Sequence, residues 1–466
     1  MVEKRKNSPR PNPIHKTNDP VWAWSRYQPD AQRPWNLALA GHLYRRAAFG
    51  ANWSELQLAL NVGPQLTIDK LLQPRTDAIV FNHRYDQYDA SAADGGSADS
   101  LRAWWLRRIL QTPSPLLEKL TLFWHSHFAI DNAAVKSGRL MLQYMKILRR
   151  NALGKFRDML TELVRNPAML IALGGGTNRK SQPNENFVRP LFDTFTLGPG
   201  HYRETDIQEA ARAFTGLFVF KGRLRDIPRE HDNGVKQILG QEGTFTRDDV
   251  VRIVLAQKAT SRHIVRKLYR QFISETVEPL KEIIDSLAEI FAKDYNIQNV
   301  IEIMLRSNLF FSPVAYRHRV KSPLDFSLNL IKGLEAIVPT IQLSLDLANL
   351  GQNLYHAPTV KGWTGGAHWM DTAAVTGRFN LAEALLGKEK SYADKLHPRQ
   401  IAAKHGHHET KSAAQFMVNL FLQDDLEASV RNALWKRFDG IESSNPEEAI
   451  RRFVHIIALL PEFQLD

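Results

Sequence analysis

The residues best suited to chemistry lie in one polar stretch, 178–198, which reads NRKSQPNENFVRPLFDTFTLG. It places three asparagines beside two arginines, a lysine, a glutamate and an aspartate. Apolar helical patterns flank it, so we expect it near the core, where buried amides and charges need partners. The stretch therefore either stabilises the fold or forms a site. In a site, Glu185 would be the catalytic carboxylate, and the substrate-binding residues would be Asn178, Arg179, Lys180, Asn184, Asn186 and Arg189.

A pair of histidines in FWHSHF, residues 123–128, supplies a candidate acid–base group. On a helix His125 and His127 point about 200° apart, so they cannot face one ligand together unless the helix ends at His125. His125 shares its face with Glu118, which favours His125 as the catalytic or metal-binding histidine. The alternative is that both histidines are core or boundary residues, each satisfied by one hydrogen bond.

Two further segments carry candidate residues. In REHDNGVK, residues 229–236, His231 and Asp232 could act in catalysis and Lys236 could hold an anionic substrate. The alternative is a plain hairpin turn, which the sequence Asp-Asn-Gly favours. In VKGWTGGAHWMD, residues 360–371, Trp363 could stack on a sugar or a base, and the alternative is a tightly packed loop.

Helical spacing dominates the elements that must position these residues. We expect a mainly α fold, an irregular multi-helix bundle with one small β-hairpin excursion near residues 218–240. There LFVFKGRLRD and GVKQIL would pair around a polar loop. Residues 1–35 are expected to form a flexible polar arm with aromatic anchors at Trp22, Trp24 and Tyr27, and residues 36–466 a single helical domain.

Within the polar stretch, Asn184 is a candidate helix cap, and Glu185, Arg189 and Asp193 would then share one face. Such ion pairs contribute a few tenths of a kcal/mol each, which is a sufficient structural role. Pro190 opposes a continuous helix, because proline inside a helix costs about 3 kcal/mol. The alternative is a helix that begins near Arg189, with a loop before it.

Composition narrows the class of protein. The 466 residues are 43% hydrophobic and 24% charged, as in an ordinary globular protein, and the net charge of +12 is dispersed along the chain. The absence of cysteine excludes disulfides and thiolate metal sites. No basic recognition helix follows the helical pattern at 204–217, so nucleic-acid binding is not expected. With no signal-like start and no membrane-length apolar run, we expect a cytoplasmic chain without a membrane partner.

The motifs, in their order, resemble those of the DUF1800 family, bacterial proteins of unknown function. The family's phrases are similar to LYRRAAFG at 43–50, FWHSHF at 123–128, the stretch 177–198, HDNGVK at 231–236 and TVKGWTGG at 359–366. The resemblance implies a helical single-domain protein and a partner of the DUF1501 type, related to sulfatases. It implies no activity and no cofactor. At Pro190 and Asp193 the chain departs from the family pattern, which has glutamate there, so a site that used the first glutamate would be altered in this member.

Our functional hypothesis is that these polar motifs converge into one cleft of an uncharacterised enzyme. A hydrolase or a metal-dependent enzyme acting on an anionic substrate fits that arrangement, with histidine and carboxylate groups beside arginine and lysine. The metal and the cofactor are left open. The alternative is a non-catalytic scaffold or partner of a DUF1501-type, sulfatase-like protein.

Overall fold

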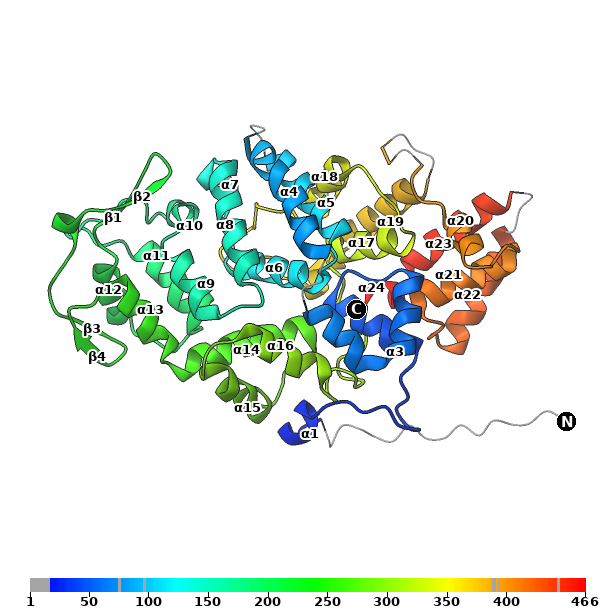
Figure 1. Ribbon diagram of the computed structural model, residues 1–466, viewed down its shortest axis with the longest axis horizontal. Coiled ribbons are helices and arrows are strands. Elements are labelled where there is room, and N and C mark those ends of the chain that lie inside the picture. Colours follow the sequence, from blue (N-terminus) through cyan, green and yellow to red (C-terminus); the bar gives the residue numbers. More distant parts are fainter. Residues whose placement is uncertain (1–16, 74–76, 95–97, 388–390, 393, 442–444) are drawn as a thin grey trace.

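The computed structural model describes residues 17–73, 77–94, 98–387, 391–392, 394–441 and 445–466. It is an elongated, mainly helical body, as expected, with two small β-hairpins at one end and helices α19 to α23 at the other (Figure 1). The first helices along the chain are α1 (Pro20–Trp24), α2 (Leu37–Ala47), α3 (Trp53–Leu72), α4 (Asp77–Asp94) and α5 (Ala98–Gln111).

The middle of the chain forms the central helices and the end that carries the hairpins. These helices are α6 (Pro115–His127), α7 (Asn132–Val135), α8 (Gly138–Asn151), α9 (Phe156–Leu163), α10 (Pro167–Ala172), α11 (Glu185–Pro190), the π-helix η2 (Leu191–Thr196), α12 (Glu204–Ala213) and α13 (Arg247–Leu255). After them come α14 (Lys258–Phe272), α15 (Lys281–Ala292), α16 (Ile297–Arg306), α17 (Pro323–Gly333) and α18 (Thr340–Asn349).

The last part of the chain packs as a group of helices around α23, which contacts α19, α20, α21 and α22. Its elements are the 3₁₀ turn η4 (Gly366–Trp369), α19 (Thr372–Leu386), α20 (Pro398–Lys404), α21 (Thr410–Leu422), α22 (Ala428–Ile441), α23 (Pro446–Leu459) and α24 (Pro461–Gln464).

Two local hairpins replace the single expected one. Strand β1 (Leu217–Phe220) pairs antiparallel with β2 (Arg223–Asp226), and β3 (Lys236–Ile238) pairs with β4 (Gln241–Gly243). The 3₁₀ turn η3 (Pro228–Glu230) lies between them. Each hairpin closes on its own two-residue turn with positive φ, which suits the strand twist and needs only a short loop. Pairing across the polar loop would have closed a longer loop, so the local turns prevail.

Residues 17–35 of the expected arm lie against the helical body, and residues 1–16 are outside the described residues. Tyr27 is fully buried, and its N–H donates to the carbonyl of Arg306 at 2.7 Å. The indole N–H of Trp24 donates to the carbonyl of Ile283 at 2.9 Å. The aromatic anchors seen in the sequence therefore hold this segment on α15 and α16.

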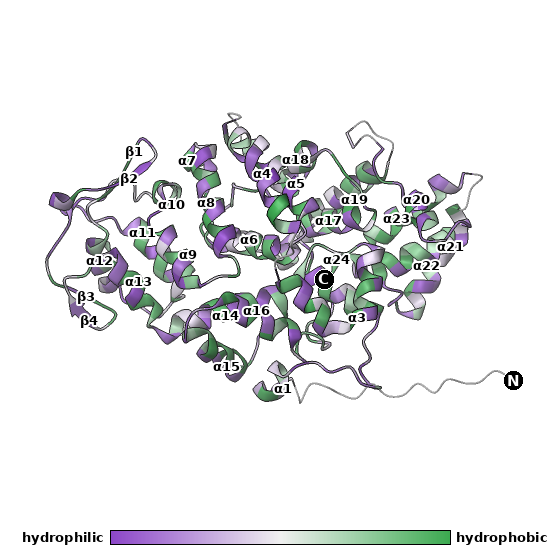
Figure 2. Ribbon diagram, viewed as in Figure 1, coloured by the Kyte–Doolittle hydropathy of each residue, from purple (hydrophilic) through white to green (hydrophobic). Residues whose placement is uncertain are grey.

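One cluster of buried apolar residues extends along the molecule, from Ala23 to Phe463. Figure 2 shows apolar and hydrophilic positions alternating around most helices, as expected for amphipathic helices that share a core. In the part of the chain that the structure describes, no helix combines the length and the apolar character needed to cross a bilayer.

Candidate functional site

The loop 359–369 is fastened to the end of α6 by close backbone contact. Gly362 has a φ of 77°, and a Cβ at this position would overlap the Ser126 carbonyl and lie 2.5 Å from the Ser126 Oγ. The N–H of Trp363 donates to the same Oγ at 3.4 Å. Only glycine combines this φ with this approach, so the glycine-rich motif holds its loop against FWHSHF.

His125, the histidine favoured from sequence, is fully buried beneath this loop. Its Nε2 accepts from the N–H of Tyr355 at 3.0 Å, and its ring lies 5.6 Å from that of Trp363 between centroids. Burial lowers the pKa of His125 to about 3, so the ring is neutral. Glu118, expected beside it, instead accepts from Arg108, Arg149 and Trp105. His125 thus packs and anchors the loop.

Helix α11 continues directly into the wider π-helix η2 at Pro190. Proline has no N–H, so one α-helical hydrogen bond is missing at this residue. Beyond it the N–H of Leu197 donates to the Phe192 carbonyl at 2.9 Å, a spacing of five residues. The departure from the family pattern at Pro190 therefore falls at the start of the π-helix, a rare element often found at functional sites.

Two carbonyls at the end of η2 receive their hydrogen bonds from side chains. A helix leaves its last carbonyls without a helical donor, and here Pro199 also lacks an N–H. The Thr194 carbonyl accepts from His263 Nε2 at 3.0 Å and from Lys267 Nζ at 3.1 Å. The Phe195 carbonyl accepts from His127 Nε2 at 3.1 Å. The π-helix thus gathers three titratable side chains from α6 and α14.

The tautomer of His127 follows from these contacts. Its Nε2 faces a carbonyl, which can only accept, so Nε2 carries the proton and Nδ1 is an acceptor. Lys267 Nζ lies 3.0 Å from that Nδ1 and donates to it. Lys267 is therefore held between two neutral acceptors, the His127 ring and the Thr194 carbonyl.

Burial shifts all three groups toward their neutral forms. It lowers the pKa of Lys267 to about 8, against the charge of Asp193 and with the help of Lys361. Burial and the charge of Lys267 lower the pKa of His263 to about 4, and the pKa of His127 lies well below its ordinary value for the same reasons. Near neutral pH both histidines are uncharged, and a fraction of Lys267 is a free amine.

These groups lie on the wall of a cleft of about 570 Å³ between α6, α14 and the loop 359–369. In Figure 1, α6 lies above α14 near the middle of the molecule. The aromatic side chains in its lining belong to Phe123, Trp363 and Trp369. Its lining holds two carboxylates, Glu275 and Asp325, and a larger set of cationic residues: Lys119, Arg266, Lys267, Arg270, Arg319 and Lys361.

Some of the cleft's cations are neutralised within the fold. Lys119 pairs with Asp325 at 2.6 Å, Arg266 with Glu278 at 2.7 Å and Arg319 with Asp466 at 2.9 Å. Lys361 Nζ is 4.0 Å from Asp193, at the limit of an ion pair. Among the described residues no carboxylate lies within 4.0 Å of Lys267 or Arg270. The cleft therefore offers positive charge to a ligand.

The first half of the polar stretch lies outside the cleft and forms a cluster of hydrogen bonds around the start of α11. Asn178 is buried, and its Oδ1 accepts from the Asn184 N–H at 3.0 Å. Asn184 caps α11 by accepting from the Asn186 N–H at 2.8 Å, and it also donates to the Gly174 carbonyl. Arg189 is exposed and pairs with Glu185 at 2.9 Å and with Glu204. These residues cap and brace the helix.

The segment 229–236 lies beside that hydrogen-bonded cluster. Arg179 pairs with Glu230 at 3.2 Å, and the N–H of Lys180 donates to the Glu230 carbonyl at 3.0 Å. Asp232 pairs with Arg212 at 2.7 Å, which lowers the pKa of Asp232.

Two more predicted residues complete this segment. His231 donates through Nδ1 to the Thr215 carbonyl at 2.9 Å. Lys236 is buried and donates to the carbonyls of Asp232 and Gly234 at 2.6 and 2.9 Å. Two of the three donors of its ammonium group are thus used within one turn.

The predicted residues fall into two groups. His125 and Trp363 meet at α6, while the residues of 178–189 and of 231–236 meet around β1 and α12. The C-terminal half of the polar stretch forms η2, which continues from α11 and meets α6 and α14. The sequence reasoning favoured His125 over His127, and it missed His263 and Lys267 of α14. Their signal was the helical face HxxRKxxR of α14 at 263–270, where polar residues recur at spacings of three and four.

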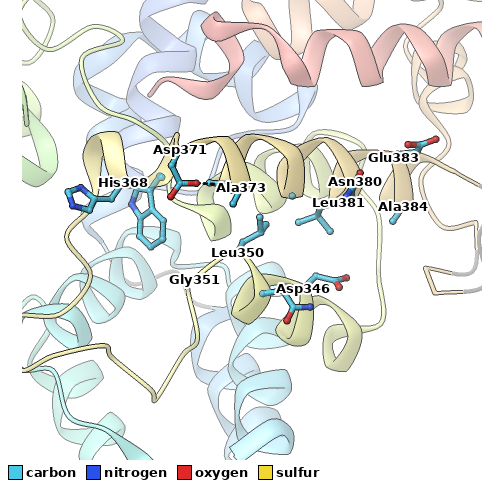
Figure 3. Close-up of a pocket in the computed structure, with 14 residues that line it drawn as sticks. Asp346, Leu350, Gly351, His368, Asp371, Ala373, Asn380, Leu381, Glu383 and Ala384 are labelled. Atoms are coloured by element: carbon cyan, nitrogen blue, oxygen red, sulfur yellow. Dashed lines mark hydrogen bonds between the residues drawn. The ribbon is translucent and has the colours of Figure 1, made fainter.

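A second cavity, of about 660 Å³, lies between α18 and α19 and has an acidic lining (Figure 3). Two of its three carboxylates, those of Asp346 and Asp371, are already engaged. Asp346 accepts from Tyr392 at 2.5 Å, and Asp371 caps α19 by accepting from the Ala374 N–H at 2.7 Å. The described residues contain no group of three or more His, Asp or Glu side chains arranged as metal ligands.

A family model described as "Protein of unknown function (DUF1800)" matches residues 42–465, which include every segment of the cleft. No curated protein and no solved structure matches the chain.

Proposed function

The chain belongs to the DUF1800 family, and we propose that it binds an anionic small molecule in the cleft between α6, α14 and the loop 359–369, as the substrate site of an enzyme. One observation carries this proposal. Positive charge in the cleft exceeds what the chain's own carboxylates neutralise, and it surrounds a partly buried amine held by neutral acceptors. Cations that line a cleft with a shortage of counter-charge are suited to carboxylate, phosphate or sulfate groups.

The cleft also has features of a site rather than of a general basic surface. Trp363 and Phe123 provide apolar walls, and Lys267 and His127 provide groups that can exchange a proton. A hydrolytic or metal-dependent reaction, expected from sequence, stays a prediction. Of the residues singled out from sequence, the proposal uses Trp363; the roles expected for His125, Glu185, His231 and Asp232 are not needed for it.

Anion binding is tested by calorimetry with inorganic phosphate and with citrate. We expect Arg270→Gln and Lys361→Gln each to weaken binding about tenfold, since a charge-assisted hydrogen bond contributes about 1.5–3 kcal/mol. Added sodium chloride should weaken binding further. Arg223→Gln, on the exposed strand β2, is the matched control with the same loss of charge and should bind as the wild type does. Equal affinities of the wild type and both cleft variants would reject the proposal.

A role in binding a protein partner is the second candidate, and a row of exposed apolar side chains favours it. Ile337, Ile341 and Leu345 recur every fourth residue before and along α18, with exposures of 64, 59 and 40%. Contiguous exposed apolar residues often mark protein interfaces. The partner expected from the family resemblance is a DUF1501-type, sulfatase-like protein.

Gel filtration of the purified chain mixed with a DUF1501-type protein tests this second role. We expect a complex that Ile341→Asp weakens at least tenfold, because a carboxylate buried in an apolar interface has no partner. Asp substitution at the exposed Val21 on α1 is the control. Separate elution of the two proteins at micromolar concentrations would argue against the role.

A further inference from the structure

We propose that Lys267 forms an imine with a carbonyl group of the anionic ligand, so that the ligand is an oxo acid or another small carbonyl compound that carries negative charge. The inference rests on the proposed function, because it takes the same cleft as the binding site. It adds the reacting group, the bond that forms and the chemical class of the substrate.

The first support is the hydrogen-bond geometry of Lys267. Its Nζ lies 3.0 Å from His127 Nδ1 and 3.1 Å from the Thr194 carbonyl. Both are acceptors, and each takes one N–H. A neutral amine has two N–H groups, so these two partners satisfy it and leave its lone pair unengaged. An ammonium group would carry a third N–H, for which we find no acceptor among the described residues. The site therefore matches the nucleophilic form of lysine.

The second support is the charge around the amine. Arg270 and Lys361 line the same cleft, and both disfavour a further positive charge on Lys267. With burial they lower the pKa of Lys267 to about 8. About one amine in ten is then neutral at pH 7, compared with about one in 2,500 for an ordinary lysine. Lysines that form imines are activated by this combination of burial and neighbouring cations.

The third support is that the cleft can orient a substrate with two functional groups. Arg270 has no carboxylate partner among the described residues and can hold the anionic group of the ligand. The carbonyl carbon then lies over Lys267, and Trp363 and Phe123 cover the apolar part. An anion alone would engage the cations, but only a carbonyl compound would also use the lone pair of Nζ.

The chemical step balances without any oxidant or reductant. The Nζ lone pair forms a bond to the carbonyl carbon while the C=O π electrons move to oxygen. A proton leaves Nζ and reaches that oxygen, and His127 Nδ1, which already accepts from Nζ, is the nearest base to carry it. The second proton of the amine follows, the C–O bond breaks, and water leaves. The products are the imine and one water molecule.

Reductive trapping tests the inference on the full chain. The protein is incubated with glyoxylate and sodium cyanoborohydride, and the modified lysines are located by peptide mass spectrometry. We expect Lys267 to be modified at least tenfold faster than the exposed Lys411 of α21, and acetaldehyde, which lacks the carboxylate, to lose this preference. The Lys267 rate should rise about tenfold from pH 6 to 7 and level off above about pH 8, because the fraction of free amine follows its pKa.

Variants and competition separate the possible outcomes. Lys267→Arg should abolish the preferred adduct while Lys411→Arg leaves it unchanged, and inorganic phosphate should slow trapping in the wild type. Modification of Lys267 no faster than that of Lys411 would overturn the inference, and this comparison within the wild-type protein needs no variant to fold. If phosphate still binds in calorimetry, only the imine is rejected; if phosphate does not bind either, the proposed function fails with it.

Discussion

Replacement of Glu118 with alanine is expected to lower the free energy of unfolding by about 3–5 kcal/mol, the usual cost of removing one partner from a buried ion pair. Glu118 is 1% exposed and accepts from Arg149 Nε at 2.9 Å, from Arg108 Nε at 3.0 Å and from Trp105 Nε1 at 3.0 Å. Burial alone would raise the pKa of Glu118, but the two arginines outweigh it and the pKa lies below its ordinary value. Without the carboxylate, two buried guanidinium groups would face each other.

Urea denaturation followed by circular dichroism measures this loss. The matched control is Glu185→Ala, because Glu185 is also paired with arginine on a helix but lies at the surface, 36% exposed. An exposed pair contributes under about 1 kcal/mol. Equal destabilisation by the two substitutions would show that burial of the Glu118 cluster has no energetic importance.

Replacement of Gly362 with alanine is expected to lower the free energy of unfolding by about 2–5 kcal/mol and to abolish anion binding in the cleft. About 1–2 kcal/mol comes from a side chain at positive φ, and about 1–3 kcal/mol from overlap with Ser126. The loop would have to leave α6, which would displace Lys361 and Trp363 from the cleft wall. Denaturation and phosphate calorimetry on the same preparation measure both effects.

Gly240→Ala separates the two causes. Gly240 has a φ of 80°, close to the 77° of Gly362, but a Cβ at Gly240 would meet no atom within 4 Å. Its substitution should cost only about 1–2 kcal/mol, the penalty of positive φ, and should leave phosphate binding intact. If both glycine variants lose the same stability and both bind phosphate, the contact with Ser126 does not hold the cleft together.

The two halves of the stretch 178–198 have different roles. Its first half caps and braces α11, through Asn178, Asn184 and the pair of Glu185 with Arg189. Its second half forms η2, whose carbonyls position His127, His263 and Lys267. The dense polar residues that attracted attention in the sequence are those already satisfied within the fold. The reactive groups are held by backbone carbonyls, which no side-chain pattern reveals.

Sequence alone identified the mainly helical fold, the family and the motifs whose segments meet at the cleft, because helical periodicity and glycine-rich turns are local properties of the chain. It left open whether His125 and His127 converge, and the structure decides this because α6 continues to His127. It could not decide which histidine faces the cleft. That depends on η2, which meets α6 and α14 about seventy residues away on either side. Packing between such distant segments sets burial, and burial makes His125 a structural anchor and Lys267 a reactive amine.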